Sequence, residues 1–339
     1  MTDTMKREIE AQGVLLAQIQ QDLARSADAV DPAKGRVFVG GCGDSAYAPR
    51  ALSGVFEALG LSFAARSSME LAAFTTFRPD DTVILSSISG GTKRTVEAAE
   101  TVRRAGGRVI AVTCNADSAL AEVANQTIPL PYRPISRKTP HTLDYSVTLL
   151  ALVELARSFA GQAQEATRPL IARLPELITA TREAACPVVQ GYDPDGKIFI
   201  LGVGPDLGTA EYGAAKFQEA GGLLAIAAET ENFVHGANFM LEAGDTVIAL
   251  GGSAAGHRRA QQVVEALGYV EINRHLFPED PGTAGDWLTA FRTVFEQTFV
   301  LQHACLGVST RLSLRLEEPR AGRHGGLVHQ SMQQRMMAG

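Results

Sequence analysis

The feature that most constrains the fold of this chain is an internal repeat. Residues 38–43, FVGGCG, match residues 199–204, FILGVG, at an offset of 161 positions. Residues 81–84, DTVI, recur unchanged at 245–248, at an offset of 164. One match of this kind would be chance, but several matches in the same order at nearly one offset predict two copies of one domain.

Within each copy, short apolar runs alternate with stretches of helical periodicity. In the first copy we expect strands over 36–40, 82–86 and 109–113, and helices over 45–59 and 92–105. Strands separated by helices of about a dozen residues are typical of βαβ units and a parallel sheet. The predicted fold is therefore α/β, with two tandem domains that each hold a parallel sheet flanked by helices.

The repeat also sets the expected domain limits. We expect an amphipathic N-terminal helix over 1–25, a first domain over 26–160 and a second domain over 193–316. A helical connection over 161–192, interrupted by three prolines, joins the two domains. Residues 317–339 are rich in Gly, Arg, Gln and Met without a clear period, which predicts a C-terminal tail.

Composition and motifs argue against several classes of protein. The formal net charge is −6, so no basic excess is available to neutralise a nucleic-acid backbone. The sequence has no run of about 18 apolar residues, so no membrane span is predicted. Its first residues lack a signal-peptide pattern, and we therefore expect a cytoplasmic protein. The cysteines form no C-x-x-C pair and the histidines are scattered, so no metal site is expected. The dinucleotide and Walker A patterns are both missing after the first strand, so no cofactor is expected.

Two loops of the first copy are candidates for binding a ligand, and one of them carries residue types that bind phosphate. Parallel sheets bind ligands at the carboxyl ends of their strands, and 41–45 (GCGDS) and 87–92 (SISGGT) both follow predicted strands. Helix N-termini supply free N–H groups, and short hydroxyl side chains add donors. The alternative is a set of helix N-caps, although one cap needs one hydroxyl rather than three. The residues predict a phosphate cradle at Ser87, Ser89 and Thr92, while Gly43 after the first strand allows the backbone to approach a ligand closely.

Two cations follow the second of these loops directly. Lys93 and Arg94 lie in the first turn of a predicted helix, where positive charge opposes the helix dipole. Either both side chains extend into solvent or a bound anion lies near them. The sequence leaves both interpretations open.

The second copy carries different chemistry. Its loop at 251–256, GGSAAG, has a single serine, so the hydroxyl donors are missing. Lys216 and Glu219 are three positions apart, which places them on one face of a predicted helix. Glu231 and His235 are four positions apart, and a carboxylate with an imidazole is a common proton-transfer pair near neutral pH. The alternative is a solvated helix face with a surface histidine.

These loops, together with the segment 213–219 (GAAKFQE) and His235-Gly236, resemble the sugar isomerase (SIS) domain family. More narrowly, they resemble its double-domain branch, and the resemblance covers nearly the whole chain. That branch includes the isomerase half of glucosamine-6-phosphate synthase, amino-sugar phosphate isomerases and deaminases, and fructosamine-6-phosphate deglycases. The resemblance implies that each domain is a three-layer sandwich of the flavodoxin type.

The resemblance also implies a role for particular residues. Glu219 matches the carboxylate that moves a proton between C1 and C2, His235 matches the histidine that opens the sugar ring, and Lys216 matches a lysine of the same site. In the family this histidine crosses a dimer interface, so a homodimer is implied. The family's phosphate-binding hydroxyls are matched by Ser45, Ser87, Ser89 and Thr92. Further candidates at the site are Cys42, Asp44, Lys93, Arg94 and His324.

The implied activity is that of a cofactor-free enzyme on a sugar phosphate or its amine adduct, through an enediol or enolamine. Gly91 and Ile88 depart from the synthase's loop, so the synthase reaction itself is not implied. A fructosamine-6-phosphate deglycase or an amino-sugar phosphate isomerase or deaminase is expected. The alternatives are a simple aldose–ketose phosphate isomerase and a non-catalytic sugar-phosphate sensor. The cations that could admit a second anionic group, and so favour a deglycase, are Lys93, Arg94, Arg133, Arg137 and Lys138.

Overall fold

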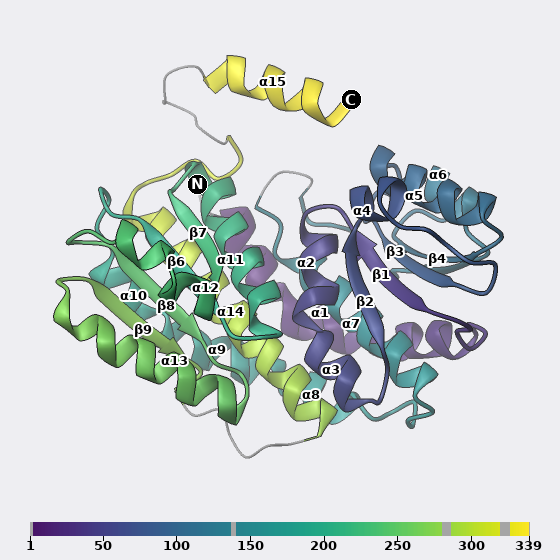
Figure 1. Cartoon of the computed structure of the whole chain (residues 1–339), viewed down its shortest axis with the longest axis horizontal. Coiled ribbons are helices and arrows are strands. Elements are labelled where there is room, and N and C mark those ends of the chain that lie inside the picture. The colour runs from purple at the N-terminus through teal and green to yellow at the C-terminus, as the bar shows by residue number, and fades with distance from the viewer. Residues whose placement is uncertain (1–2, 137–139, 280–285, 319–325, 339) are drawn as a thin grey trace. The chain divides into compact units, whose positions relative to one another are not determined.

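The computed structural model describes residues 3–136, 140–279, 286–318 and 326–338 (Figure 1). The chain divides into two compact units, each built around one parallel sheet. The first-copy unit comprises Gly13–Pro134, Asp144–Ala172 and Met332–Gly339. The second-copy unit comprises Met1–Gln12, Ile135–Leu143 and Arg173–Ser331. The opening helix α1, Asp3–Asp28, contributes residues to both.

The sheet of the first-copy unit has five parallel strands in the order β2-β1-β3-β4-β5. The order reverses between β1 and β3, and ligands of open α/β sheets bind outside the carboxyl ends of the strands at such a switch point. The strands are β1 (Val37–Gly41), β2 (Phe63–Ser67), β3 (Thr82–Ser86), β4 (Arg108–Thr113) and β5 (Gln126–Pro129).

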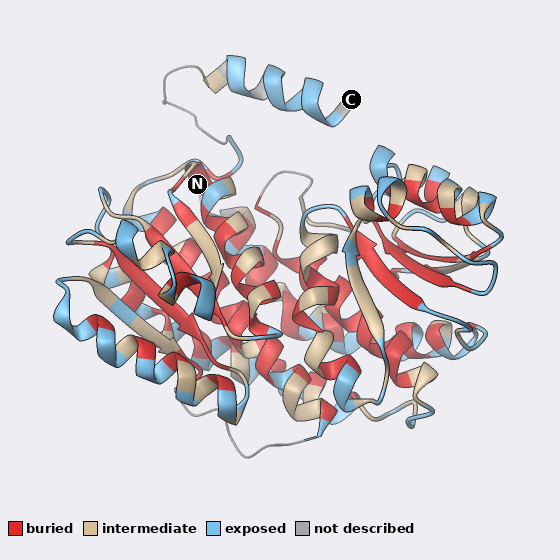
Figure 2. Ribbon diagram, viewed as in Figure 1, coloured by how far each residue is buried: buried red, intermediate tan, exposed pale blue. Residues whose placement is uncertain are grey.

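Both faces of this sheet are covered, which is why β1 and β3 are buried along their length and β4 is buried after its first residue, Arg108 (Figure 2). On one face, Phe38 packs in a cluster with buried residues of α4, α5 and α6. Phe63 lies on the opposite face, where its ring contacts Phe56 of α3 and Phe159 of α7. The helices of the unit are α2 (Asp44–Ala51), α3 (Ser53–Ala58), α4 (Ser68–Ala73), α5 (Lys93–Arg104), α6 (Ala119–Val123), α7 (Leu143–Phe159) and α8 (Arg168–Ala172).

The sheet of the second-copy unit has four parallel strands in the equivalent order β7-β6-β8-β9. One face packs against α12 and α13 through Phe233 and Val263. The strands are β6 (Ile198–Gly202), β7 (Ala225–Glu229), β8 (Thr246–Leu250) and β9 (Asn273–Phe277). The helices are α9 (Leu174–Ala184), α10 (Cys186–Gly191), α11 (Asp206–Gly221), α12 (Thr230–Val234), η1 (Ala237–Met240), α13 (Ala254–Ala266), η2 (Leu267–Tyr269) and α14 (Trp287–Arg311).

Close packing of α11 requires a residue without a side chain. A Cβ on Gly213 would lie 2.6 Å from a methyl group of Leu301 in α14 and 3.1 Å from one of Ile200 in β6. Only glycine lets α11 approach both neighbours this closely. Figure 2 shows α11 and α14 as largely buried helices, which is what positions the side chains of α11 described below.

The two copies share contacts as well as topology, which confirms the predicted repeat. Asp81 forms an ion pair with Arg36 at 2.6 Å, and at the equivalent place Asp245 forms one with Lys197 at 2.9 Å. Each carboxylate also accepts a backbone N–H three residues upstream at 2.8 Å. These carboxylates fix the starts of β3 and β8 in the same way, so the repeated DTVI motif has a structural cause.

The α/β class with two parallel sheets is confirmed, and three local expectations need correction. The helix predicted over 45–59 is two helices, α2 and α3, that meet at Leu52. The opening helix runs three residues beyond the predicted end at residue 25. Part of the predicted tail is helical, as α15 (Gly326–Ala338). The domain limits themselves stay a prediction.

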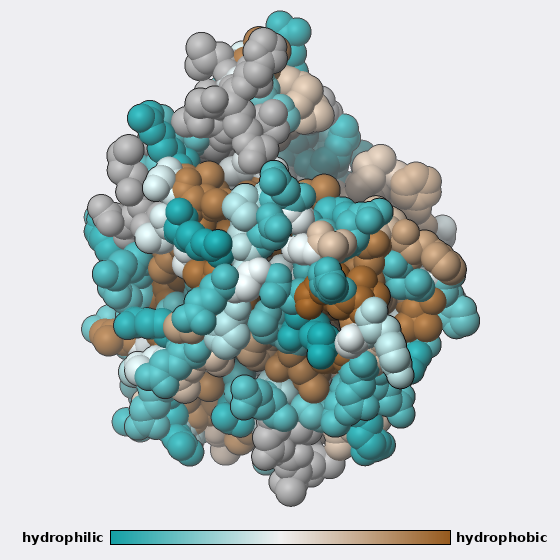
Figure 3. Space-filling model, turned by 90° about the vertical axis from the view of Figure 1, so that its left-hand side faces the viewer, coloured by the Kyte–Doolittle hydropathy of each residue, from teal (hydrophilic) through white to brown (hydrophobic). Residues whose placement is uncertain are grey.

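The surface carries scattered apolar side chains. Figure 3 shows several apolar patches separated by hydrophilic side chains on one face of the molecule. Large and strongly exposed apolar residues include Phe239 in η1 and Tyr269 in η2. In the described part of the chain, no helix is both long and apolar enough to cross a membrane.

Candidate functional site

At the switch point of the first-copy unit, the turn after β1 lies beside the end of β3. A Cβ on Gly41 would lie 2.3 Å from the Cβ of Ser45 and 2.7 Å from the backbone oxygen of Ser86, so Ser45 and β3 both touch this glycine. Gly43 has φ 55° and ψ −126°, a conformation that only glycine adopts readily. The two loops predicted to bind phosphate therefore meet at one place.

The hydroxyl groups of the loop after β3 bond to one another and to the loop backbone. Ser87 Oγ lies 3.1 Å from Thr92 Oγ1 and accepts the N–H of Gly90 at 3.2 Å. Ser89 Oγ accepts the N–H of Gly91 at 3.2 Å. Thr92 stands at the N-cap of α5 but makes no side-chain cap bond. The simple N-cap interpretation therefore does not account for this loop.

The shape of this loop depends on Gly90. Its φ is +66°, and a Cβ there would lie 2.0 Å from Ser118 Oγ. The loop is tied to the segment after β4, because Cys114 N–H donates to Ile88 O at 3.1 Å and Leu120 N–H donates to Gly90 O at 3.0 Å. The adjacent Gly91 faces open space, since a Cβ there would meet only Ser89 Oγ, at 3.9 Å. The loop is thus held in place by the segment after β4 on the side of Gly90, and it is open to solvent on the side of Gly91.

The other candidates of this unit differ in how they are engaged. Arg94 forms an ion pair with Glu97 on its own helix at 2.5 Å, which favours the solvated interpretation for this cation. The side chain of Cys42 is exposed, and its sulfur accepts a hydrogen bond from the Thr95 hydroxyl. Lys93 is exposed, and Asp44 is half-buried in the first turn of α2. The predicted candidates His324, Arg137 and Lys138 lie outside the described residues.

In the second-copy unit, the structure brings Lys216 and Glu219 into direct contact. Both are on α11, and Lys216 Nζ lies 2.6 Å from Glu219 Oε2. The lysine side chain is 1% exposed and the glutamate side chain 31%. Glu219 Oε2 is itself inaccessible, so Oε1 is the carboxylate oxygen that could reach a substrate. A buried ammonium beside a half-exposed carboxylate suits a base that must stay ionised until it takes a proton.

Cys305 of α14 is fully buried and lies close enough to Lys216 and Glu219 to interact with both electrostatically. Burial raises the pKa of its thiol to about 12, with smaller contributions of opposite sign from Lys216 and Glu219. The thiol therefore stays protonated at neutral pH, and Cys305 acts as a core residue rather than a nucleophile.

His235 follows α12 and is exposed. The Glu231 carboxylate, which the sequence suggested as its partner, accepts hydrogen bonds from Nε and Nη2 of Arg259, and His235 adds a smaller electrostatic interaction. The hydrogen bond from Arg259 holds the pKa of Glu231 below its usual value. Glu231 therefore remains ionised and is poorly suited to exchange protons with the histidine.

A buried carboxylate that was not predicted from the sequence lies at the switch point of the second-copy unit. Asp206, which is 161 positions after Ser45, is 8% exposed. It accepts the N–H of Gly252 at 2.7 Å and Nε2 of Gln297 at 2.9 Å. Burial raises the pKa of this carboxyl to about 6, against the lowering effect of both hydrogen bonds. Alignment of the two copies at this offset could have singled it out.

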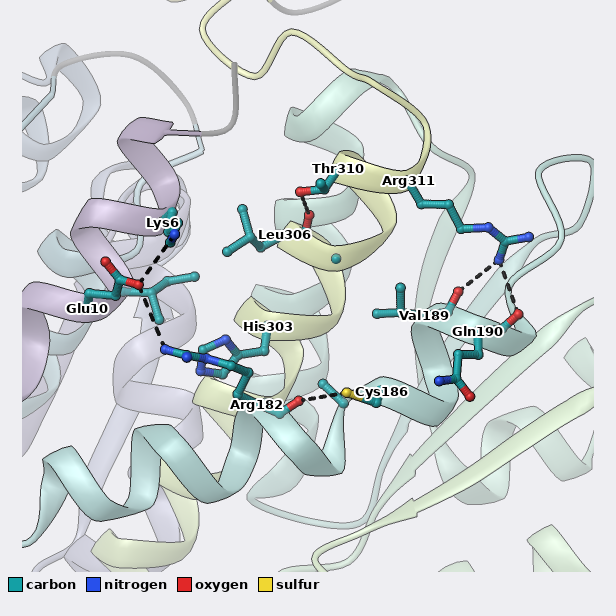
Figure 4. A pocket seen from close by; sticks show the side chains of 13 residues that line it. Lys6, Glu10, Arg182, Cys186, Val189, Gln190, His303, Leu306, Thr310 and Arg311 are labelled. Atoms are coloured by element: carbon teal, nitrogen blue, oxygen red, sulfur yellow. Dashed lines mark hydrogen bonds and ion pairs between the residues drawn. The ribbon is translucent and has the colours of Figure 1, made fainter.

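A separate cavity of about 560 Å³ lies within the second-copy unit, between the first turns of α1 and helices α9, α10 and α14 (Figure 4). None of the predicted site residues lines it. Three charged residues that line the cavity pair with one another. Oε1 of Glu10 lies 3.9 Å from Nζ of Lys6 and 3.8 Å from Nη2 of Arg182. Burial lowers the pKa of His303 to about 4, so this ring is neutral at pH 7.

Two groups of candidate residues thus emerge, each within its own unit. The hydroxyl cradle belongs to the first-copy unit, and Lys216, Glu219 and His235 belong to the second-copy unit. Among the described residues, no group of three or more His, Cys, Asp or Glu side chains is arranged to hold a metal ion.

Comparison with known proteins finds one family whose pattern matches the chain, described as the SIS domain, over residues 32–157 and 192–272. These segments make up more than half of the chain. The chain is also similar to the 3-hexulose-6-phosphate isomerase of Mycobacterium gastri, with 31% identity over 137 residues. That match covers 37% of this chain and 66% of the relative.

Solved structures with a similar fold span nearly the whole chain. Glucosamine-6-phosphate deaminase from Thermotoga maritima superposes with a TM-score of 0.77 at 20% identity, covering 93% of this chain and 97% of that one. Tagatose-6-phosphate ketose/aldose isomerase from Escherichia coli gives 0.75 at 18% identity, covering 92% and 95%. The C-terminal domain of glucosamine-fructose-6-phosphate aminotransferase from Francisella tularensis gives 0.77 at 14% identity, covering 94% and 99%.

Proposed function

Since this chain belongs to the SIS domain family, we propose that it is a phosphosugar isomerase that moves a proton between C1 and C2 of its substrate. The observation that carries the proposal is the contact between buried Lys216 and half-exposed Glu219. A non-catalytic sensor needs a phosphate cradle, but it has no use for a buried cation held against a carboxylate. The similarity to a 3-hexulose-6-phosphate isomerase supports isomerisation of a phosphosugar, and in a 3-hexulose the equivalent proton shift runs between C2 and C3.

The proposed reaction uses the two groups of residues in turn. The hydroxyls of Ser87 and Ser89, with the loop N–H groups, hold the phosphate, as a helix N-terminus does elsewhere. His235 transfers a proton during ring opening. Glu219 removes the proton from the carbon next to the carbonyl while the carbonyl oxygen takes up a proton, which gives an enediol. Glu219 then returns its proton to the former carbonyl carbon while the other enediol hydroxyl loses its proton and becomes the new carbonyl. The proton, the electron pair and the sugar atoms are all conserved, so no cofactor is needed.

An amine adduct of a sugar phosphate is the second candidate substrate, and it would use the same base. If the enolamine formed at Glu219 is protonated on carbon to an imine, water can hydrolyse that imine to a carbonyl group and the free amine, and the reaction becomes a deglycation or deamination. The exposed cations Lys93 and Arg133 favour such a substrate, because they could receive a second anionic group. The pairing of Arg94 with Glu97 weakens this preference.

We also propose that the active species is a homodimer and that His235 serves the site of the partner subunit. The support is its exposure on the turn after α12, next to the exposed side chains of Phe239 and Met240. A mixture of two inactive variants, Glu219→Gln and His235→Asn, should then regain activity through mixed dimers. If His235 acts within its own chain, the mixture stays as inactive as its components.

Proton exchange tests the main proposal. The wild-type protein is incubated in D₂O with a panel of hexulose 6-phosphates and their amino-acid adducts, and deuterium at C1 and C2 is followed by NMR and mass spectrometry. We expect exchange with at least one sugar phosphate, and Glu219→Gln should slow it by a factor of about 10²–10⁴. Undiminished exchange in this variant would show that Glu219 is not the base.

Glu231→Gln is the matched control for that experiment. It also replaces an ionised carboxylate of the second-copy unit by an amide, but one held by Arg259 rather than by Lys216. We expect its exchange rate to stay within about twofold of the wild type. Thermal stabilisation by a sugar phosphate without any exchange or turnover would support the sensor instead.

A further inference from the structure

A row of buried polar side chains leads from the Lys216–Glu219 pair to the first turns of α1. We propose that Tyr212 and Gln302 are positioning residues that hold the Lys216 ammonium against Glu219 for proton transfer. This inference rests on the proposed function and adds two residues to it. Neither residue was suggested by the sequence.

The first contact in this row is between Lys216 and an aromatic ring. Lys216 Nζ lies 5.2 Å from the centroid of the Tyr212 ring, one helical turn earlier on α11. Tyr212 is completely buried and Lys216 is 1% exposed. A buried ammonium is costly unless its charge is compensated, and a desolvated cation is attracted to the face of an aromatic ring. The ring therefore gives the ammonium a preferred position, beside Glu219.

The second set of contacts fixes the ring itself. Gln302 of α14 donates from Nε2 to the Tyr212 hydroxyl at 2.9 Å, and its Oε1 accepts Nε2 of Gln12 at 2.8 Å. Both glutamines are fully buried. Because Gln12 occupies the oxygen of the Gln302 amide, the nitrogen of that amide must face the tyrosine. The orientation of the row is thus set from α1 towards α11.

The row is also anchored beyond Gln12. Glu8, one turn earlier on α1 and 1% exposed, accepts the backbone N–H of Thr142 at 2.8 Å and its hydroxyl at 3.1 Å. Thr142 precedes α7 at the end of the cation-bearing loop after β5. Three elements distant in sequence, α1, this loop and α14, therefore support the side chains of α11. These hydrogen bonds restrict the side chains that they join.

A row of this kind could serve only to specify packing, so the test needs readouts that packing alone would not change. The primary variant is Tyr212→Leu, which removes the aromatic face, and Tyr212→Phe keeps the face but removes the hydroxyl that Gln302 donates to. Tyr192→Leu is the control, because Tyr192 is a tyrosine of the same unit that is 3% exposed and lies outside the row.

The first readout is the pH profile of deuterium exchange. With Tyr212→Leu we expect kcat to fall about tenfold or more with KM within about twofold. We also expect the acidic limb to move to higher pH, because Glu219 loses part of the cation's support. Tyr212→Phe should show a smaller fall. In Tyr192→Leu the acidic limb of the pH profile should not move, even if this variant is less stable to unfolding.

The second readout needs no substrate. In protein labelled with ¹⁵N at lysine Nζ, the Lys216 signal is assigned by its loss in Lys216→Met and followed against pH. Tyr212→Leu should shift this signal and its titration, Tyr212→Phe should shift them less, and Tyr192→Leu should leave them unchanged. An unchanged Lys216 signal and an unmoved acidic limb in Tyr212→Leu would overturn the proposal. If no sugar phosphate is turned over at all, the proposed function fails while the lysine signal still decides this inference.

Discussion

We expect the carboxyl group of Asp206 to make the folded second-copy unit less stable as the pH rises from 4 to 7. Burial raises the pKa of this group to about 6, whereas an unfolded aspartate titrates near 3.8. Between these two values the folded state binds the proton and the unfolded state has lost it. The free energy of unfolding must therefore fall as the pH increases through this range.

The magnitude follows from the difference between the two pKa values. A shift of about two units corresponds to about 3 kcal/mol in full, and about half of it falls between pH 5 and pH 7. Asp206→Asn removes the titration with almost no change in shape. The amide side chain of this variant can still accept the Gly252 N–H, and its nitrogen can donate to Gln297 Oε1, which has no hydrogen-bond partner among the described contacts.

The assay is urea unfolding followed by the fluorescence of Trp287, the one tryptophan in the sequence, which lies 7% exposed on the same helix as Gln297. At pH 7 we expect Asp206→Asn to be more stable than the wild type by about 1–3 kcal/mol, and at pH 4.5 by much less. Asp245→Asn is the control. Asp245 is 1% exposed but paired with Lys197, so this variant should lose about 1–3 kcal/mol at pH 7.

The decisive quantity is the pH dependence of the difference between Asp206→Asn and the wild type. If that difference is the same at pH 4.5 and pH 7, the carboxyl group does not titrate in this range and the reasoning from burial is wrong. If Asp206→Asn is as damaging as Asp245→Asn at pH 7, its charge-assisted hydrogen bonds outweigh the cost of burying the charge.

Three further outcomes test the loops and the repeat. Gly90→Ala should lower the free energy of unfolding, measured in urea, by at least about 2 kcal/mol, because alanine disfavours the positive φ and its Cβ would overlap Ser118. Gly91→Ala is the control and should leave the free energy of unfolding nearly unchanged. Ser87→Ala should weaken sugar-phosphate binding in calorimetry by about tenfold or more, since a charge-assisted hydrogen bond contributes about 1.5–3 kcal/mol, and unaltered affinity would place the phosphate elsewhere. Asp81→Asn should be destabilising at pH 7, and the deficit should shrink only as the pH falls below 3.8 and through the pKa of folded Asp81, which bonds from Arg36 and Arg78 keep low against the effect of burial. A deficit that does not change between pH 7 and strongly acidic pH would contradict this.

The fold could be predicted from the sequence because the repeat is imposed by local necessities. A Cβ on Gly35 would lie 2.4 Å from a backbone oxygen of the turn before β3, and one on Gly196 would lie 2.5 Å from a backbone oxygen of the turn before β8. Asp81 and Asp245 both tie two strand starts together. Requirements of this kind recur at the same position in each copy, so they are visible as identical letters. The position of the hydroxyl loop followed as well, since every strand of a parallel sheet ends at one edge.

The contacts that refine the site could not be predicted, because each joins residues far apart in the chain. Arg259 reaches Glu231 across 28 positions and so removes that carboxylate from the proposed pair with His235. Gln12 reaches Gln302 across 290 positions. The spacing of Lys216 and Glu219 predicted a shared helix face, but a solvent-exposed face has the same spacing. Their burial depends on α14, whose position no local pattern reveals.

The two copies differ at one equivalent pair of positions. At the offset of 161, Lys216 and Glu219 of the second copy stand where the first copy has Val55 and Ala58. Val55 is as buried as Lys216, at 1% exposure, and hydrophobic burial alone stabilises it. An ammonium at the same depth is unfavourable unless a carboxylate, an aromatic face or a hydrogen-bond acceptor compensates it. The second copy therefore requires Tyr212, and through it Gln302 and Gln12, before a charge can be held in its core. The first copy has its own buried charges elsewhere, and these also depend on distant partners. Its Glu154–Arg157 ion pair is held by hydrogen bonds from Gln20 and to Asp28, both on α1.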